Sequence, residues 1–508
     1  MTHTTKVEGR SRWQRLLLAG LVAMGLLTAA ACTQQPTVTV KKFVIGASAE
    51  PASMDVTTSP SAAGPQVMLY NVYETLVRID GDGKMRPMLA QSWDISADGR
   101  VYTFHINPAA TFASGTKVTG SAVVKSQDKL RSDAATTTVL RTQLADVATV
   151  TAPDDATVVF TLKNPSQNWL YYMTSTAGIV FDPTLIGEAA TKSAGSGPYA
   201  WTAWNKGSSV VLTKNAKYWG TAPRFDEVTF RYFTDANALN AAMLAGDLDV
   251  ISNVQAPEAL SQFSDTSKYT VLDGATNGEV TMGFNHQSPA LQNQNVRKAI
   301  TMAIDRAALI KTVWAGKGQL IGSMAVPTDP YYVDLANAVP FNVAEAKALL
   351  ASSGVAMPTL RIRVPALAYA TKSAQFVASA LNEIGIKTTV DELPFPATWL
   401  DQVYKNGDYD ITIVAHVEPR DINKFADPTY YWHYNNPAFQ ALIAKADTEP
   451  TEAAWLADMA DAQKVLTDDA AAVWLFMLPN LVVTKNTVTG LSPNAVTLSF
   501  DLTGVARR

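Results

Sequence analysis

The pattern of apolar and polar positions changes its period along the chain. Around Tyr102, Phe104 and Ile106 apolar and polar residues alternate, and Asp98-Gly99 before them supplies turn residues, which predicts a β-hairpin. A second hairpin is predicted over residues 147–163, with a polar turn between its strands. Short apolar strands are also expected at the start of the domain, near residue 44, and after residue 213.

Helical spacing of three and four residues dominates the second half of the chain. Helices are predicted over residues 66–80, 235–245, 295–313, 342–353 and 371–384. Asn342 and Glu345 form a capping box at the start of one of them. Strands and helices mixed in this way, over about 475 residues after an N-terminal leader, predict an α/β protein with more than one domain.

The N-terminal residues predict export and lipidation. Three arginines precede an apolar run from Leu16 to Leu27, and Ala29, Ala30 and Ala31 stand directly before Cys32, the one cysteine of the chain. A basic head, a short apolar core and small residues at the cleavage point are typical of a secretory signal. A cysteine at that point resembles a bacterial lipobox, so Cys32 is predicted to carry the lipid anchor.

Charge and composition exclude several classes of protein. Residues 1–31 carry four basic residues and one acidic residue, so their removal takes the net charge from −4 to about −7. An acidic chain does not favour a nucleic-acid partner. No stretch after the leader is long and apolar enough to span a bilayer, and a single cysteine excludes an internal disulfide.

Five groups of segments, taken together and in order, resemble the extracellular solute-binding proteins that deliver peptides, nickel and related cargo to ABC transporters. These are "NVYETLVRID", "LAQSWDISADGRVYTFHIN", "GSGPYAWTAW" with "LTKNAKYWG", "NVRKAITMAIDRAALI" and "GDYDIT". Within them, Tyr218, Trp219 and Trp93 are interpreted as packing residues rather than ligand contacts. These motifs therefore identify a scaffold and leave the cargo open.

The resemblance implies an α/β, two-lobed, class II periplasmic-binding-protein-like fold with an extra subdomain in the first lobe. The implied division is a signal peptide over 1–31, a lipid-anchored tether over 32–41, lobe 1 over 42–275 and 481–508 with the subdomain at about 87–190, and lobe 2 over 276–480. Such a protein captures a peptide or peptide-like solute by hinge closure and delivers it to the permease subunits of an importer. It is expected to be a monomer without cofactor or catalytic residues, anchored to the outer face of the cytoplasmic membrane.

In that family, ligands lie between the lobes and contact loops that follow strands. Two candidate stretches precede residue 180. The first, "AEPASMD", contributes Glu50, Met54 and Asp55. The second, "NPSQNWLYYMTSTAG", contributes Asn168, Trp169, Tyr171 and Tyr172, whose rings combine apolar faces with hydrogen-bonding tips. Packing at the edge of the subdomain is an equally good interpretation of this second stretch.

The third candidate stretch, "AHVEPRDINKFADPTYYWHYNNP", follows an apolar strand at 409–414. Asp421 matches the position at which peptide-binding relatives place an acid against the ligand's amino terminus, and Glu418 is the second choice. Arg420 and Trp432 are further candidate contacts. A carboxylate in a closed, dry cleft pairs strongly with an ammonium group. The alternative is a solvated loop whose charges pair with each other.

One departure limits the peptide interpretation. Dipeptide-binding relatives hold a ligand carboxylate with an arginine before a helix of lobe 2, whereas this chain has Tyr369 and Lys372 there. Lysine offers a single point charge rather than a fork. With only His416 and His433 near the third stretch, a bare metal site is not expected, and a nickel or other metal chelate, or another non-peptide solute, is the alternative cargo. A secreted hydrolase is disfavoured because the sequence lacks nucleophile-elbow, zinc-protease and Walker A motifs.

Overall fold

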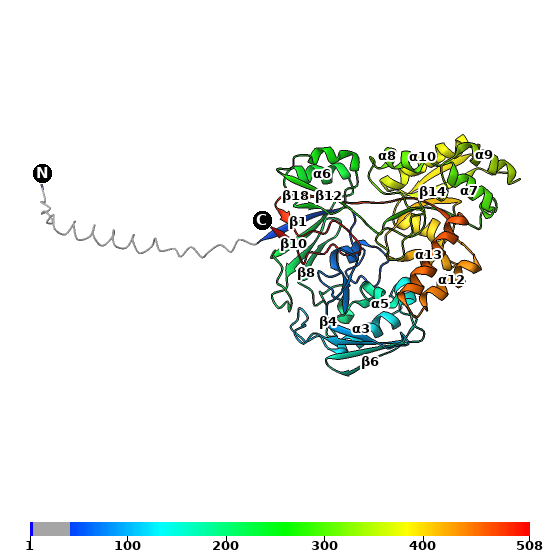
Figure 1. Cartoon of the computed structure of the whole chain (residues 1–508). Coiled ribbons are helices and arrows are strands. Elements are labelled where there is room, and N and C mark those ends of the chain that lie inside the picture. The colour runs from blue at the N-terminus through cyan, green and yellow to red at the C-terminus, as the bar shows by residue number, and fades with distance from the viewer. Residues whose placement is uncertain (4–40) are drawn as a thin grey trace. The chain divides into compact units, whose positions relative to one another are not determined.

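This computed structural model describes residues 1–3 and 41–508. The chain divides into a unit Met1–Lys41 and a compact unit Lys42–Arg508, and the helices and strands below belong to the second unit (Figure 1). Cys32, the signal peptide after residue 3 and the tether up to residue 40 lie outside the described residues. Across the described part of the chain, none of the helices combines the length and the apolar character needed to cross a membrane.

A seven-stranded mixed sheet, in the order β12-β18-β11-β1-β10-β9-β8, organises the part that we call lobe 1. Its strands are β1 (Lys42–Ala47), β8 (Tyr199–Asn205), β9 (Ser209–Lys214), β10 (Glu227–Tyr232), β11 (Val250–Ile251), β12 (Tyr269–Gly274) and β18 (Asn480–Lys485). The strand β1 runs parallel to both β10 and β11. The helices and turns of this lobe are α2 (Ala63–Met68), α6 (Ala236–Leu244) and η3 (Pro257–Phe263), and a ribbon of β19 (Val488–Thr489) and β20 (Ala506–Arg507) lies near the C-terminus.

A four-stranded antiparallel sheet, β4-β5-β7-β6, forms a subdomain inserted between β1 and β8. Its strands are β4 (Ala90–Ile95), β5 (Val101–Ile106), β6 (Val147–Asp154) and β7 (Thr157–Leu162), and the short strands β2 (Val77–Ile79) and β3 (Met85–Pro87) precede them. The helices and turns are α3 (Gly120–Ser132), α4 (Thr138–Gln143), α5 (Trp169–Tyr172), η1 (Thr176–Gly178) and η2 (Ile186–Glu188). Tyr102, Phe104 and Ile106 point together into a separate hydrophobic core of this subdomain.

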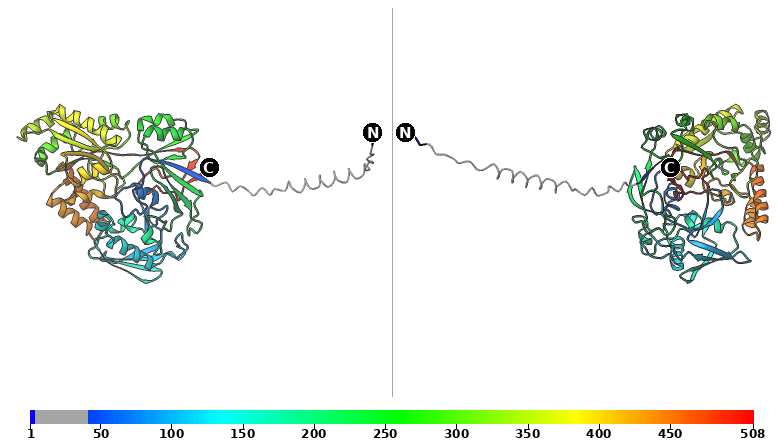
Figure 2. Two further views of the ribbon diagram at one scale, coloured as in Figure 1. Left: turned by 180° about the vertical axis from the view of Figure 1, so that it is seen from behind. Right: turned by 60° about the vertical axis from the view of Figure 1, so that its left-hand side comes forward.

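A five-stranded sheet, β15-β14-β16-β13-β17, organises the part that we call lobe 2. Its strands are β13 (Glu279–Phe284), β14 (Leu360–Pro365), β15 (Thr388–Leu393), β16 (Ile411–His416) and β17 (Ala472–Met477). The helices and turns are η4 (Pro289–Gln292), α7 (Gln294–Met302), α8 (Arg306–Val313), α9 (Val343–Ser352), α10 (Ala368–Glu383), α11 (Ala397–Trp399), η5 (Leu400–Lys405), η6 (Asp421–Ala426), α12 (Pro437–Asp447) and α13 (Glu452–Asp468). The helix α10 packs on β14, β15 and β16, and α12 and α13 form a separate antiparallel pair (Figure 2).

Two short segments join the sheets of the two lobes. One connects Gly274 at the end of β12 to Glu279 at the start of β13, and the other connects Met477 of β17 to Asn480 of β18. These segments are tied together because Thr276 Oγ1 donates a 2.5 Å hydrogen bond to the carbonyl of Leu478, and the Leu478 amide donates one of 2.7 Å to Gly278. A paired connection of this kind is where a hinge between the lobes would bend.

Most predicted elements are found, but the strand expected from residue 213 stops at Lys214, where β9 ends, and two predicted helices differ. The helix predicted over 295–313 is divided into α7 and α8, because Asp305 caps a new helix by accepting a hydrogen bond from the Ala308 amide. The helix predicted over 66–80 is wrong beyond Met68. There the backbone pairs with distant segments instead: the carbonyls of Asn71 and Val72 accept from Tyr199 and Gly197. Tertiary pairing has therefore overridden the local helical pattern.

Tyr218 and Trp219 have the packing role expected of them, around a buried carboxylate. Glu74 accepts hydrogen bonds from Ser196 Oγ at 2.8 Å, Tyr218 OH at 2.9 Å and Trp219 Nε1 at 3.0 Å. Burial raises the pKa of Glu74 to about 7, although these three bonds act in the opposite direction. The network joins the segment before β2 to the residues on either side of the β8–β9 hairpin, all within lobe 1.

We expect Glu74→Ala to lower the free energy of unfolding by at least about 2 kcal/mol, because it leaves three donors without their acceptor. Denaturant unfolding followed by fluorescence measures this. Glu188→Ala is the matched control, since Glu188 is half exposed and pairs only with Lys192 at the surface. A loss for Glu74→Ala no larger than that of the control would show that the network contributes nothing to stability.

Candidate functional site

The candidate site is built on the segment that leaves β16. His416 is the last residue of that strand, so it lies on the sheet and not in the loop where it was predicted. Arg420 has a left-handed backbone, with φ of 59°, and the 3-10 turn η6 begins immediately after it at Asp421. A non-glycine residue in this region is uncommon and is held by the surrounding structure. The turn directs the Asp421 side chain back towards the end of β16.

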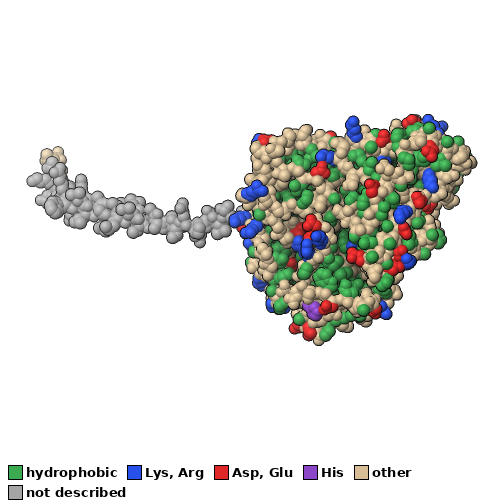
Figure 3. Space-filling model, in the orientation of Figure 1, with side chains coloured by type: hydrophobic (Ala, Val, Ile, Leu, Met, Phe, Trp, Pro, Cys, Tyr) green, Lys and Arg blue, Asp and Glu red, His purple; other side chains and the backbone are tan. Residues whose placement is uncertain are grey.

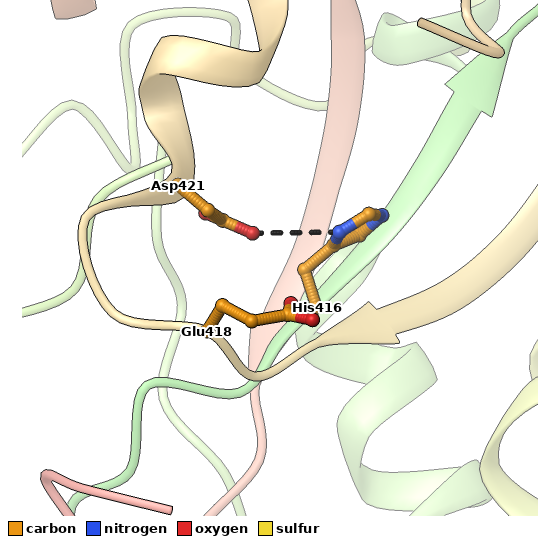
Figure 4. A group of neighbouring side chains, drawn as sticks. All are labelled: His416, Glu418 and Asp421. Carbon is orange, nitrogen blue, oxygen red and sulfur yellow. Dashed lines mark ion pairs between the residues drawn. The ribbon is translucent and has the colours of Figure 1, made fainter. Parts of the chain in front are cut away.

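Asp421 is a buried carboxylate with one free oxygen. Its side chain is 2% exposed, and its Oδ2 lies 3.4 Å from His416 Nδ1 and 3.5 Å from Lys424 Nζ. Figure 4 shows the Asp421 carboxylate pointing at the His416 ring, with Glu418 beside them. The other oxygen, Oδ1, is buried without a protein hydrogen-bond partner. An unpaired buried acceptor of this kind is costly, and a donor from a ligand would satisfy it.

Lys424 supplies the positive charge within this segment. Its Nζ lies 3.1 Å from Glu418 Oε2 as well as 3.5 Å from Asp421 Oδ2. Burial acts to raise the pKa of Glu418, but Lys424 and then His416 overcome it and lower that pKa to about 2. Burial likewise acts to lower the pKa of Lys424, and Glu418 and Asp421 hold it above its ordinary value. Glu418 and Lys424 therefore form a stable ion pair beside Asp421.

Two further carboxylates of lobe 2, Glu279 and Asp329, lie near Asp421. Glu279 stands opposite His416 on the β13–β16 ladder, which places the two side chains on one face of the sheet. Burial and then the nearby charges of Asp421 and Asp329 raise the pKa of Glu279 well above its ordinary value. Burial also raises the pKa of Asp329 to about 7. The surroundings of Asp421 are thus rich in carboxylates, and burial outweighs the opposing effects of Arg420 on the pKa of Asp329 and of Lys424 on the pKa of Glu279.

Arg420 and Asn423 connect this segment to the inserted subdomain. The Arg420 guanidinium lies 3.8 Å from the centre of the Tyr171 ring and 5.0 Å from that of Trp455, and its Nη1 lies 3.4 Å from Asn168 Oδ1. Asn423 Nδ2 lies 3.4 Å from the hydroxyl of Tyr172. A cation over an aromatic face is attractive, and more so when both are removed from water. The loop that carries Asp421 therefore contacts both lobes.

A second contact between the lobes lies at the end of α12. The carboxylate of Asp447 accepts hydrogen bonds from Ser166 Oγ at 2.9 Å, from Asn168 Nδ2 at 2.8 Å and from the Asn168 amide at 3.1 Å. The Gln167 amide donates to the carbonyl of Asp447 at 2.9 Å, and Gln167 Nε2 donates to that of Glu449 at 2.7 Å. We call this group, residues 166–168 with Asp447 and Glu449, the Asp447 latch. It holds the subdomain against lobe 2.

A cavity of about 90 Å³ lies between the two lobes next to these contacts. Its walls come from the segment 56–69, from α4, from the residues around α5 and η1, and from Thr497 and Leu498, and lobe 2 contributes Glu418 and Pro419. Figure 3 shows apolar side chains gathered in a hollow on the face that Figure 1 presents. A concave, mainly apolar space with a few polar groups is the ordinary form of a small-molecule site.

The other predicted site residues are placed as follows. Met54 is fully buried in the core of lobe 1, and Trp169, 1% exposed, packs among Tyr102, Phe104 and Phe160 of the subdomain. Trp432, also 1% exposed, stacks on Phe425 with ring centres 4.0 Å apart. The hydroxyl of Tyr369 accepts from the Ala415 amide, and Lys372 pairs with Glu258 of lobe 1 at 2.8 Å. These side chains pack within the protein, whereas Tyr171 and Glu418 line the cavity.

The structure also brings in residues that the sequence did not single out. Asp447 was missed because its partners lie about 280 residues earlier, and Asp329 because an acid beside Pro330 is an ordinary turn residue. Glu279 carried a visible signal, since it opens the otherwise uncharged strand EVTMGF, in which every residue is buried. A carboxylate at such a position is expected to have a specific partner or function.

His416, Glu418 and Asp421 also form a group that could be considered for a metal ion, since their ligand atoms lie within 4.8 Å of one another. The ammonium group of Lys424 already lies between Glu418 and Asp421. A metal ion would have to displace this internal cation from two carboxylates. The arrangement therefore favours a role for Asp421 in binding an organic cation.

Two lobes, joined by a pair of short segments and meeting beside a cavity, define a two-lobed binding protein of the periplasmic type. The family model for bacterial extracellular solute-binding proteins, family 5, middle region, matches residues 84–441, and the chain belongs to this family. Members of the family are binding proteins that act outside the cytoplasm, which confirms that the protein is not an enzyme.

Individual relatives agree with this assignment. The chain is 27% identical over 474 residues to the probable D,D-dipeptide-binding periplasmic protein DdpA of Escherichia coli K12, covering 85% of this chain and 88% of that one. Among solved structures it resembles DppA from Helicobacter pylori in complex with the peptide STSA, with a TM-score of 0.81, 23% identity, and 92% and 98% of the two chains covered. It also resembles AgaA from A. tumefaciens R10 in complex with agropinic acid, with a TM-score of 0.79, 25% identity, and 92% and 99% covered. The predicted two-lobed α/β fold is confirmed.

We expect Asp447→Ala to open the ligand-free protein, because it removes three hydrogen bonds that cross between the lobes. Hydrogen bonds to a charged group contribute about 1.5–3 kcal/mol each, so losing them should shift the ratio of closed to open molecules by at least about tenfold. Small-angle scattering should show a larger radius of gyration. Glu449→Ala is the control, since its side chain pairs with Lys445 and only its backbone takes part in the latch. An equal radius for all three proteins would exclude the latch as a determinant of closure.

Proposed function

We propose that the protein is the substrate-binding component of an ABC importer and that it captures a peptide or peptide-like solute by its amino terminus. The single observation that carries this proposal is the free, buried Oδ1 of Asp421 on a loop that meets both lobes. An ammonium group supplies a charge-assisted donor for such an oxygen. The ligand, by touching both lobes, selects the closed state over the open one.

The relatives favour a peptide-like cargo. DdpA, by its name, binds D,D-dipeptides, and it matches this chain along most of both lengths. The second lobe offers no free cation near Tyr369 for the ligand's carboxylate, since Lys372 is paired with Glu258 across the lobes. A non-peptide solute is the second candidate, because AgaA, a relative of similar fold, is known in complex with agropinic acid.

We expect Asp421→Asn to weaken the binding of D-Ala-D-Ala or L-Ala-L-Ala by at least about thirtyfold. Removing one member of a buried charge pair costs about 2–5 kcal/mol, and the amide cannot pair with the ligand's ammonium group. Isothermal titration calorimetry with both stereoisomers measures the change. The wild-type protein should also lose affinity to the same extent when the dipeptide is N-acetylated.

Glu418→Gln is the matched control for this experiment. Glu418 is engaged by Lys424, so its replacement should change affinity far less than the replacement of Asp421. Binding within about twofold of wild type for Asp421→Asn would refute the amino-terminus contact and favour a neutral or anionic solute. Retained binding of the acetylated dipeptide would lead to the same conclusion.

We also propose the domain boundaries, the partners and the anchor predicted above. Lobe 1 comprises 42–275 and 481–508 with the subdomain at about 87–190, and lobe 2 comprises 276–480. The positions of Gly274, Glu279, Met477 and Asn480 at the ends of strands support these boundaries. The protein is proposed to act as a monomer, to dock on permease subunits, and to be held at the outer face of the cytoplasmic membrane through Cys32.

We expect Cys32→Ser to release the protein from the membrane, because the serine hydroxyl does not replace the thiol that is acylated. Fractionation of cells followed by immunoblotting measures the distribution, and metabolic labelling with a palmitate analogue should label only the wild-type chain. A single acyl chain binds membranes weakly, so the lipid should include a diacylglycerol. Membrane retention of Cys32→Ser equal to that of wild type would contradict the anchor.

A further inference from the structure

One wall of the cavity between the lobes is apolar. The segment 56–69 contributes Val56, Pro60 and Pro65, and α4 contributes Val139 and Leu140. Val139 is 36% exposed, which makes it one of the few large hydrophobic residues of the described chain that face out of the core. Because it lines the cavity, this exposed surface faces the space where a ligand would lie. Apolar surface left open at a binding site is available to be covered by a ligand.

The cavity has no unbalanced charge among the described residues that line it. Glu418 is the one carboxylate of the lining, and Lys424 neutralises it at 3.1 Å. The rest of the rim consists mainly of hydroxyl groups, such as those of Ser59, Thr137 and Thr176. A charged group entering this space would lose its water and gain no opposite charge, so it would be rejected. An aliphatic group has no charge to desolvate, so its burial in this space would be favourable.

The cavity lies within reach of Asp421. Lys424 Nζ contacts Glu418, which lines the cavity, and also Asp421, at 3.1 and 3.5 Å. The two carboxylates are therefore no more than about 7 Å apart through this ammonium group. That span corresponds to about two extended residues. A ligand with its amino terminus at Asp421 can thus place the side chain of its first or second residue in the cavity.

The size of the cavity narrows the choice of side chain. Its volume is about 90 Å³. An engineered apolar cavity of about 150 Å³ holds a benzene molecule, so the present space suits a group smaller than an aromatic ring. A branched aliphatic chain such as that of leucine or valine fits this description. Glycine and alanine would leave the cavity partly empty.

We propose that this pocket selects cargo with an uncharged aliphatic side chain in one of its first two residues, and that Val139 and Leu140 of α4 determine the selectivity. The inference rests on the proposed function for the position of the cargo's amino terminus. It deepens that function by naming the class of side chain. The inserted subdomain thereby supplies the selective wall, while lobe 2 supplies the charged anchor.

The test compares dipeptides by calorimetry with the full mature chain. Leu-Ala and Ala-Leu are compared with Asn-Ala and Ala-Asn, because asparagine has nearly the shape of leucine but is polar. Ala-Ala gives the reference. Each buried methylene contributes about fourfold in affinity, so the leucine peptide of the favoured order should bind at least about tenfold more tightly than both its asparagine counterpart and Ala-Ala.

Val139→Phe tests the pocket itself, since the larger ring fills it from an exposed helical position. We expect it to abolish the preference for the leucine peptide over Ala-Ala and over the asparagine peptide. Val271→Phe is the matched control, because Val271 on β12 is 37% exposed and is not part of the cavity lining. It should leave both affinities unchanged.

The outcomes separate this inference from the proposed function. Tight binding of Ala-Ala without a preference for leucine, or an equal loss for all peptides in Val139→Phe, overturns the pocket and leaves the peptide assignment standing. If no dipeptide binds, isopentylamine and ethanolamine serve as simple cationic probes in a thermal-shift titration. Stabilisation by isopentylamine alone, abolished by Val139→Phe, then supports the pocket although the peptide assignment falls. Equal effects of the two amines overturn the pocket as well.

Discussion

Buried negative charge is the constraint around which this protein is organised. The buried carboxylates Glu279, Asp329 and Asp421, with the partly exposed Glu418, interact around the end of β16 and the start of β13. Their electrostatic interactions involve two side-chain cations, Arg420 and Lys424. Carboxylates removed from water must be paired, hydrogen-bonded or protonated. Lys424 stabilises Glu418 and one oxygen of Asp421, while Glu279 and Asp329 respond with raised pKa values. One oxygen of Asp421, Oδ1, remains buried without a hydrogen-bond donor from the protein.

The same constraint links binding to closure. Arg420 adjoins Asp421 in sequence, and its guanidinium lies on Tyr171 of the subdomain, so the cation that could otherwise neutralise the acids is used for contact between the lobes. A ligand cation that donates to the free oxygen of Asp421 would balance part of the negative charge of these carboxylates. Arg420 would then keep its contact with Tyr171. The Asp447 latch also joins the lobes, through hydrogen bonds that involve none of the four carboxylates, and Asn168 links it to the Asp421 loop because its Oδ1 contacts Arg420. The lobes thus meet through two sets of contacts of different physical kind.

Local patterns in the sequence were sufficient to predict most helices and strands. Pairing between segments that are far apart in the chain could not be predicted from them. The capping box was predicted because Asn342 and Glu345 interact within one turn, and Asn342 Oδ1 does accept from the Glu345 amide at 3.1 Å. The hairpin at 90–106 follows from alternation and a two-residue turn signal. The false helix after Met68 shows the limit, since the partners of Asn71 and Val72 lie more than 120 residues away, at Tyr199 and Gly197.

In the candidate site, too, residues of one continuous segment could be predicted, and residues brought to it by tertiary structure could not. The segment with Asp421, Glu418 and Arg420 could be located from its place after a strand and from its resemblance to known binding proteins. Its neighbours could not, because Glu279 reaches it through strand pairing and Asp329 through the packing of a loop that is some 90 residues earlier in the chain. Trp432 was a candidate contact because it follows Asp421 in the same stretch, yet it packs in the core of lobe 2. In the proposed mode of binding, a buried charge would fix one end of the cargo strongly but without regard to its side chains, and a neutral apolar wall would be weak at each contact but would distinguish one side chain from another.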